Sequence, residues 1–435
     1  MTIEQAQALK QDLIDWVYNA EGEIAVALET FVAEYANCDR YDSKIQSIVV
    51  DTFLTQGQVG DRTPVELYSE QAKLTAAART LLNDWQRSFT GLFEIVETLP
   101  QGFTLMNWLT AKRYTAFADN IPEDELKRLG SGEIILTRMT PISESEWMFS
   151  PCILKGKLGK PKLAVAIGEF KENYRGQLYS DAPELLEQAW DSVAQFHQEF
   201  VDFFGSDRLT LSGYELNKQL AELQQIMSHK RLAAAGIDGS KSLQEVAQEA
   251  GVDAEELTTA AAAESGESSD TVAQAVEGAL SSPMVTPKID LPPEIKNAEH
   301  VTSFSHPRWG QMFIPTYAQF VSTLTAKDDS QPINPDLVRK YLQDPTINFY
   351  IWQQLKESYH DALERALQTT LARPEFSLER DLEPLLLEYG KPSEPELPET
   401  ASVPLHLHNL FEAAVAQVHK SKSKGKKKKK AKGFQ

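Results

Sequence analysis

The sequence predicts an α+β protein that is mainly helical around a central small antiparallel β-sheet or barrel. Three observations predict it: apolar residues recur at helical spacing through residues 1–87, short segments rich in aromatic and β-branched residues follow, and helical spacing returns from residue 299. The 435 residues are 42% hydrophobic, which is typical of a packed protein and leaves room for two or three domains.

Residues 1–87 are expected to form an N-terminal helical bundle. Apolar residues from Leu9 to Tyr35 predict one long helix with a possible bend at Gly22. A shorter helix is expected over residues 43–54. A third is expected from Thr63 to about Trp85, because Thr63-Pro64-Val65-Glu66 combines a capping residue, an N1 proline and an acid that reaches back to the cap.

Residues 88–205 are expected to form an antiparallel sheet or barrel with a closing helix. Five or six strands are predicted from short segments separated by turn residues: FTGLFEIVETL, GFTLMNWL, RYTAFA, EIILTRMTPI, EWMFSPCILK and LAVAIGEF. Consecutive strands without an intervening helix favour a small barrel, and the SH3-like and OB-like kinds are both open. The closing helix is predicted to begin at Asp181-Ala182-Pro183-Glu184, a second cap-proline-acid pattern, and to end at Gly205.

The remaining chain alternates helical and linker segments. We expect a helical extension over 206–257, a disordered acidic and Pro-bearing linker over 258–298, and a C-terminal helical domain over 299–391, with helices at 308–324, from Asn334, at 347–372 and at 378–389. A Pro/Glu tether covers 392–404, an amphipathic helix 405–419 and a disordered Lys-rich tail 420–435. The domain boundary is placed in the acidic linker.

Charge gives the main functional clue. The last sixteen residues contain nine lysines and no acidic residue. The rest of the chain has 34 of the 43 Lys and Arg residues and all 63 Asp and Glu residues, so its net charge is about −29, compared with −20 for the whole chain. Such a tail indicates a polyanionic partner, and a run of lysines binds nucleic acid in a salt-sensitive, mainly sequence-independent way. The predicted nucleic-acid-binding lysines are Lys420, Lys422, Lys424, Lys426, Lys427, Lys428, Lys429, Lys430 and Lys432.

A second basic cluster lies in the predicted sheet. Lys155, Lys157, Lys160 and Lys162 crowd a stretch with two glycines and a proline, which is typical of a hairpin tip. Small barrels commonly bind nucleic acids through loops and aromatics, so these lysines are also predicted to bind nucleic acid. Aromatic and basic neighbours that could assist are Trp108, Lys112, Arg113, Tyr114, Arg138 and Trp147.

The segment Ser242–Val252, SLQEVAQEAGV, has small residues and a turn glycine at the spacing of two crossing helices. It resembles the first helix and turn of bacterial helix-turn-helix repressors. The resemblance covers about a dozen residues and departs where DNA would be read, since the following residues, Asp253 to Leu257, present carboxylates to phosphate. It implies a small structural or protein-binding helical pair.

No catalytic residue, metal ligand set or cofactor motif is predicted. Glu357 and His360 form one Glu-x-x-His pair where a di-metal carboxylate site needs two, and His406 with His408 are too few for a tetrahedral site. His197 is expected at the edge of a helical core. Gly239-Ser240-Lys241-Ser242 lacks the full spacing of a phosphate-binding loop.

These patterns favour a non-enzymatic binding or adaptor protein, localised to RNA or the ribosome by its tail, with a further protein as partner. One alternative is a peripheral membrane adaptor that uses the tail together with helix 405–418; another is an enzyme of unrecognised class; a third use of the tail is closure over the acidic residues 238–278. The N-terminus lacks the features of a secretory signal, and Cys38 and Cys152 lie outside any CxxC pattern. A cytoplasmic location is therefore expected.

Overall fold

The computed structural model describes residues 1–36, 43–234, 284–286, 288–325, 334–415 and 417–418. Contacts divide the chain into two compact units, unit 1 with Met1–Leu186 and Pro404–Gln435, and unit 2 with Glu187–Val403. The protein is 55% helical and contains a closed five-stranded barrel with further sheets. The predicted α+β class is confirmed.

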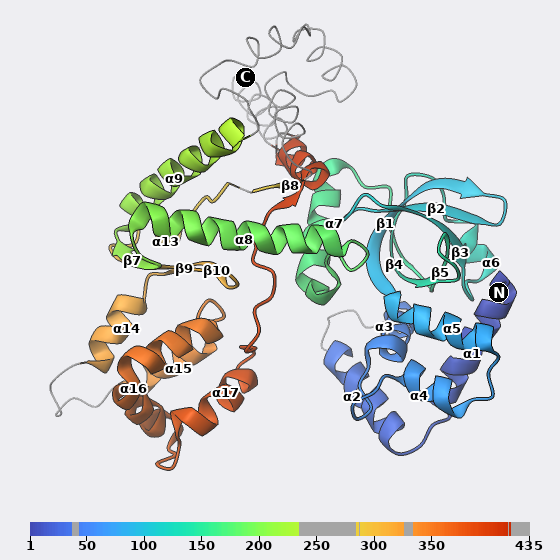
Figure 1. Ribbon diagram of the computed structural model, residues 1–435, viewed down its shortest axis with the longest axis horizontal. Coiled ribbons are helices and arrows are strands. Elements are labelled where there is room, and N and C mark those ends of the chain that lie inside the picture. The colour runs from blue at the N-terminus through green and yellow to red at the C-terminus, as the bar shows by residue number, and fades with distance from the viewer. Residues whose placement is uncertain (37–42, 235–283, 287, 326–333, 416, 419–435) are drawn as a thin grey trace, which may run out of the picture. The chain divides into compact units, whose positions relative to one another are not determined.

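The first part of unit 1 is the predicted helical bundle (Figure 1), with helices α1 (Ile3–Tyr18), α2 (Glu23–Ala36), α3 (Ser43–Gln56), α4 (Pro64–Gln71) and α5 (Ala76–Asp84). The long helix expected up to Tyr35 is two helices, because the chain turns at Gly22 with a positive φ of 74°. The helix expected from Thr63 is also divided in two. Its start is confirmed: Pro64 lies at N1 and the Glu66 carboxylate accepts from the Thr63 N–H at 2.8 Å.

The barrel follows directly and closes on itself. Its strands run in the order β1-β2-β3-β5-β4 and β4 returns to β1. All neighbouring pairs are antiparallel except β3 and β5, which pair in parallel from Thr115 opposite Glu146. This five-stranded Greek-key closure is the OB-like alternative of the two predicted. The strands are β1 (Phe89–Leu99), β2 (Gly102–Asn107), β3 (Arg113–Ala118), β4 (Ile134–Pro141) and β5 (Glu146–Phe149), and β6 (Ile153–Gly156) adds to β4.

Aromatic rings fill the barrel interior. Tyr114 and Trp147 meet edge to face with centroids 5.3 Å apart, and Phe89 contacts both rings. Edge-to-face contacts of this kind stabilise a core beyond the burial of area alone. Trp147 is therefore a core residue and Tyr114 packs against the same core, so the stacking surface proposed from these aromatics is not on the outside of the barrel.

Four local predictions in this region are wrong. The segment EWMFSPCILK is two strands, β5 and β6, and not one, and a short helix, α6 (Glu123–Leu126), lies between β3 and β4 where no helix was expected. The segment LAVAIGEF is not a strand but part of helix α7 (Lys160–Asn173), because Leu163, Ala166, Ile167 and Phe170 form one buried helical face. Lys155 to Lys162 consequently do not form a hairpin tip. They span the end of β6, the turn at Gly159 and the first turn of α7.

Unit 2 is built on a three-stranded sheet in the order β10-β9-β7, and β7 pairs with β9 across about ninety residues of sequence. The helix expected over 308–324 is confirmed only from Tyr317 to Leu324, and its first half is wrong. His306 accepts from the N–H groups of Arg308 and Trp309, and Gly310 turns the chain at a φ of 70° into β10. The elements are α8 (Pro183–Phe204), β7 (Arg208–Leu211), α9 (Gly213–Ala234), β8 (Met284–Val285), α13 (Pro293–Lys296), β9 (Val301–His306), β10 (Gly310–Ile314) and α14 (Tyr317–Leu324).

The last helices of unit 2 match the predicted positions. They are α15 (Pro335–Gln343), α16 (Phe349–Leu371) and α17 (Leu378–Glu388), before β11 (Val403–Pro404). In the core that these helices share with α14, Phe320 and Tyr341 stack with centroids 3.9 Å apart, and Trp352 meets both rings edge to face. None of the helices in the described part of the chain combines the length and apolar character needed to cross a bilayer.

Residues 405–415 are helical, as predicted, and one face of this helix is covered. Leu407, Leu410, Ala413 and Ala414 are buried, whereas Val415 is 56% exposed. Within unit 1, His406 Nε2–H donates to the carbonyl of Trp108 at 2.8 Å. The apolar face that the membrane alternative requires is thus largely used by the chain itself. The tail that follows, 419–435, lies outside the described residues.

Candidate functional site

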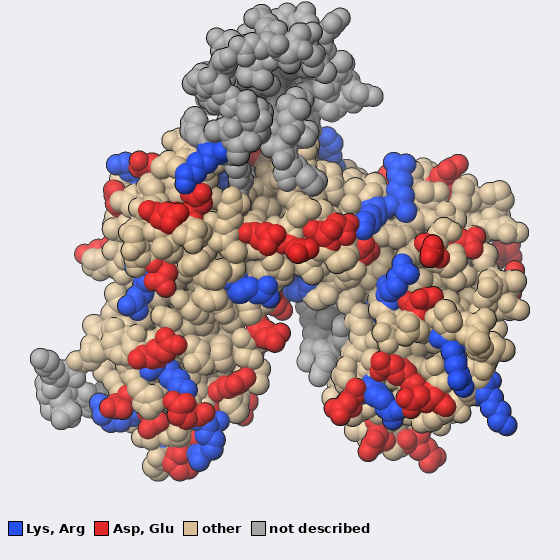
Figure 2. Space-filling view, in the orientation of Figure 1, with Lys and Arg blue, Asp and Glu red and all other residues tan. Residues whose placement is uncertain are grey.

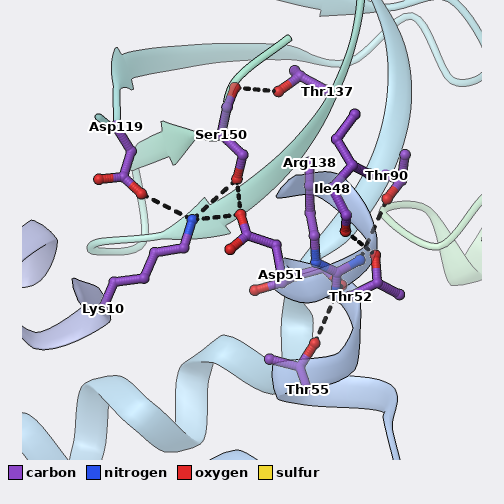
Figure 3. Close-up of polar contacts among 11 residues, drawn as sticks. Lys10, Ile48, Asp51, Thr52, Thr55, Thr90, Asp119, Thr137, Arg138 and Ser150 are labelled. Carbon is purple, nitrogen blue, oxygen red and sulfur yellow. Dashed lines mark hydrogen bonds and ion pairs between the residues drawn. The ribbon is translucent and has the colours of Figure 1, made fainter. Parts of the chain in front are cut away.

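A buried ionic cluster joins the helical bundle of unit 1 to the barrel (Figure 3). The ammonium group of Lys10, on α1, lies 2.7 Å from Asp51 on α3 and 2.9 Å from Asp119, which follows β3. It donates to the hydroxyl of Ser150 at 3.0 Å, and that hydroxyl donates to Asp51. Each of these four residues is at most 7% exposed. A carboxylate pair and one cation therefore lie where water does not reach them.

The protonation of Lys10 follows from this surrounding. Burial acts to lower its pKa, but the charges and hydrogen bonds of Asp51 and Asp119 outweigh burial, so the pKa of Lys10 is raised. The lysine is consequently charged at neutral pH and holds the two carboxylates together. The charged lysine is suited to fixing the orientation of the helical bundle on the barrel, and not to exchanging protons near neutral pH.

A second buried cation, Arg138 on β4, contacts α3 one turn further along the helix, at Thr55 (Figure 3). Its guanidinium donates to the hydroxyl of Thr55 at 2.5 Å, to the carbonyl of Ser88 at 3.3 Å and to the hydroxyl of Thr90 at 3.4 Å. Arg138 is 1% exposed. It is therefore a buried support for the start of β1 and not the surface contact for nucleic acid that the sequence suggested.

A polar cavity of about 420 Å³ opens directly beyond this support. Its volume lies within the range of small-molecule sites. It is formed by the end of α3, the 3₁₀ helix η1 (Trp85–Arg87), the end of α7 and the 3₁₀ helix η2 (Arg175–Gln177). The lining holds two arginines and no acid: Gln56, Gln86, Arg87, Ser88, Asn173, Tyr174, Arg175, Gly176, Gln177 and Ser180.

Hydrogen bonds hold the wall of the cavity in place. The amide of Gln177 donates to Gln56 Oε1 at 2.9 Å and accepts from the Thr90 N–H at 3.2 Å, which ties η2 to α3 and to β1. Arg87 lies over the ring of Trp147, 5.7 Å from its centroid. The cavity is thus built on rigid elements of the barrel unit, as a binding site requires.

Asp181, next to the cavity residue Ser180, binds the barrel instead of capping α8. One carboxylate oxygen accepts from Tyr114 at 2.5 Å, Thr110 at 2.8 Å and Asn107 at 3.0 Å. Burial raises the pKa of Tyr114 and the charge of Asp181 adds to this, so the phenol stays protonated and donates. Helix α8 does begin at Pro183, as predicted, but the carboxylate expected at its cap fixes the barrel rim.

The predicted basic residues are not brought to this cavity. Lys155 lies 3.5 Å from Glu169, within β6 and α7, and Lys157, Lys160 and Lys162 follow it into the helix. The lysines of the tail lie outside the described residues. The assignment of both groups to nucleic acid stays a prediction.

The histidine pairs do not form sites in the described ranges. Helix α16 is kinked at Tyr359, which separates Glu357 from His360, and His360 lies 3.6 Å from Glu379. His197 Nδ1 lies 3.1 Å from the Ser305 hydroxyl. Among the described residues no group of three or more His, Cys, Asp or Glu could hold a metal ion. Burial raises the pKa of the Cys152 thiol to about 11, so this cysteine is a protonated core residue.

Comparison of the chain with protein-family models, with curated proteins and with solved structures found no match. The resemblance of Ser242–Val252 to a helix-turn-helix falls outside the described residues.

Proposed function

We propose that the protein is a non-enzymatic, cytoplasmic RNA- or ribosome-associated adaptor whose tail attaches it to RNA. The single observation that carries the proposal is the charge contrast: nine lysines without an acid end a chain that otherwise has a net charge of about −29. An acidic body repels RNA, so attachment depends on the one segment with the opposite charge.

The folded units support this division of roles. Figure 2 shows Lys and Arg side chains interspersed with Asp and Glu on the face drawn, without a continuous basic surface on that face. The closed OB-like barrel belongs to an architecture that commonly binds oligonucleotides, which favours RNA over other polyanions. The folded parts then provide contacts with a protein partner.

The membrane alternative is less well supported. A basic tail alone attaches weakly to an anionic bilayer, and stable attachment takes a second, apolar anchor. Leu407, Leu410, Ala413 and Ala414 of the helix before the tail are buried, so they do not offer that anchor. Membrane binding is an outcome that the experiment below can reveal.

Neutralising the tail tests the proposal. Replacing all nine tail lysines by glutamine keeps the length of the chain and should abolish co-sedimentation with ribosomes and binding to RNA. The native chain should lose affinity by a factor on the order of 10³ between 50 and 200 mM salt if most of the nine lysines contact phosphates. The thermal midpoint should be unchanged.

A comparison variant replaces Lys155, Lys157, Lys160 and Lys162 by glutamine. It measures how much of the RNA binding depends on the second basic cluster and not on the tail. Unchanged co-sedimentation of the tail variant would overturn the proposal. So would flotation of the native chain with anionic vesicles accompanied by no RNA binding, because that result assigns the tail to a membrane.

A further inference from the structure

We infer that the polar cavity of unit 1 binds a phosphorylated sugar, either as a free nucleotide or as the 5′-phosphorylated end of an RNA. The site itself is independent of the tail, and only its use on RNA depends on the function proposed above.

The charge of the cavity is opposite to that of the chain. Acidic residues outnumber basic ones by 63 to 43 in the whole sequence, yet the lining contains Arg87 and Arg175 and no carboxylate. The neighbouring Asp181 is turned to the barrel, where three donors hold one of its oxygens. A guanidinium group has the charge and the paired N–H donors that bind phosphate oxygens, and Arg87 and Arg175 bring two such groups to the lining.

One buried hydroxyl in the lining has no hydrogen-bond partner within the described part of the chain. Ser88 is 4% exposed, and among the described residues no group bonds its Oγ. Buried hydroxyls are ordinarily hydrogen-bonded, so the hydroxyl of this lining residue is a group that a ligand in the cavity could bond. The Ser88 carbonyl is fixed by Arg138 from behind, which holds this residue in place.

The amide side chains of the lining favour a ligand that carries hydrogen-bonding groups in addition to a phosphate. Gln86 donates to Glu66 at 3.0 Å and Asn173 donates to the carbonyl of Glu169 at 2.8 Å. Both side chains use their nitrogens in these bonds, which leaves their oxygens to accept from a ligand. Gln56 conversely uses its oxygen, with Gln177, which leaves its nitrogen to donate. A ligand with hydroxyl or amino groups beside its phosphate satisfies both kinds of group, and a phosphorylated sugar is of that class.

Binding is tested by calorimetric titration of the full-length chain that carries the glutamine tail, so that the lysines do not bind phosphate themselves. The probes are a nucleoside 5′-monophosphate, the matching nucleoside, inorganic phosphate, and one oligoribonucleotide with either a 5′-phosphate or a 5′-hydroxyl. We expect the monophosphate to bind more tightly than the nucleoside or inorganic phosphate. The oligonucleotide pair identifies the source, since preference for the 5′-phosphate assigns an RNA end and equal weak binding assigns the free nucleotide.

The variants Arg87→Gln and Arg175→Gln should each weaken binding at least about tenfold, because each removes a charged hydrogen-bond donor. Ser88→Ala removes the unpartnered hydroxyl without disturbing a bond and should weaken binding several-fold in a chain that folds normally. Arg79→Gln is the matched control: this exposed arginine of α5 does not line the cavity, and its loss should leave affinity unchanged.

Three results would overturn the inference: no binding of the monophosphate, equal binding of nucleoside and monophosphate, or an equal loss in the Arg79→Gln and Arg87→Gln variants. Tighter binding of inorganic phosphate than of the monophosphate would reject the sugar and with it the ligand class. All of these are distinct from failure of the tail experiment, which concerns ribosome and RNA attachment of the native chain.

Discussion

The two units of the protein are stabilised in different ways. In unit 1 the helical bundle meets the barrel through buried charges, whereas in unit 2 the helices α14–α17 pack around stacked aromatic rings. Of the five charged side chains that are buried in the described ranges, Lys10, Asp51, Asp119 and Arg138 belong to unit 1, and Lys391 belongs to unit 2.

The two kinds of core have different effects: one mainly stabilises the fold, and the other mainly fixes the orientation of the parts that it joins. An apolar core stabilises by area and tolerates changes of similar volume, while a buried ionic group is costly to assemble and accepts few orientations. The cavity of unit 1 lies against the buried cation Arg138, which donates to the Ser88 carbonyl and to the hydroxyl of Thr55, next to Gln56. Unit 1 therefore has the fixed geometry that a binding site requires, and unit 2 has the character of a scaffold.

The strongest test of this comparison is Lys10→Met. Removing the cation leaves Asp51 and Asp119 buried without it, and breaking a buried pair in this way costs about 3–5 kcal/mol. Hydrogen exchange followed by mass spectrometry should show faster exchange in α3 and β4 and no change in α15 and α16. The triple variant Lys10→Met, Asp51→Asn, Asp119→Asn removes all three charges and should recover much of the loss; equal slowing or acceleration in both units would contradict the comparison.

The sequence predicted local features well where the signal was itself local. The start of α4 follows from Thr63, Pro64 and Glu66, and strands β1 to β4 follow from runs of aromatic and β-branched residues between turn residues. The prediction of secondary structure from the sequence was wrong where an apolar segment was short. LAVAIGEF fits a strand or a helix equally in composition, and only its packing as part of α7 decides.

The site could not be predicted because its residues meet only after folding. Lys10 bonds Ser150 across 140 positions and Thr90 bonds Gln177 across 87. Arg87 and Arg175 stand singly in the sequence, so no charge run marks them, whereas the lysines that do form runs lie elsewhere. A search for clustered charge therefore finds the tail and misses the cavity. The hairpin of β9 and β10 was not predicted because β9 is rich in polar residues, and only its folded packing shows that Thr302, Ser303 and Ser305 are buried.

The contribution of Lys10 to the free energy of unfolding should depend on pH, which gives a second test of the comparison between the units. Its pKa is raised in the folded protein, so its contribution is complete below the ordinary lysine pKa of about 10.4 and is lost as pH rises through the higher folded value. The difference in unfolding free energy between the native chain and Lys10→Met should therefore be constant from pH 7 to 9 and shrink above about 10.4. Tyrosines of the unfolded chain also lose their protons in this pH range. Both chains contain the same tyrosines, so this contribution cancels in the difference between their unfolding free energies. Denaturant titration at each pH measures the difference, and a difference that grows with alkalinity would contradict the sign of the shift.

The smallest expected effect comes from the same substitution in both units. Ser150 and Ser303 are both fully buried, but Ser150 bonds Lys10 and Asp51 in unit 1, whereas no group among the described residues bonds the Ser303 hydroxyl in unit 2. Ser150→Ala should cost about 1–3 kcal/mol because it removes hydrogen bonds to charged groups, and Ser303→Ala should be neutral or stabilise by less than about 1 kcal/mol because it removes an unsatisfied polar atom. Denaturant unfolding of the two variants measures both values. Equal costs would show that buried polar groups act alike in both units, and the distinction between a specifying and a scaffolding unit would then fail.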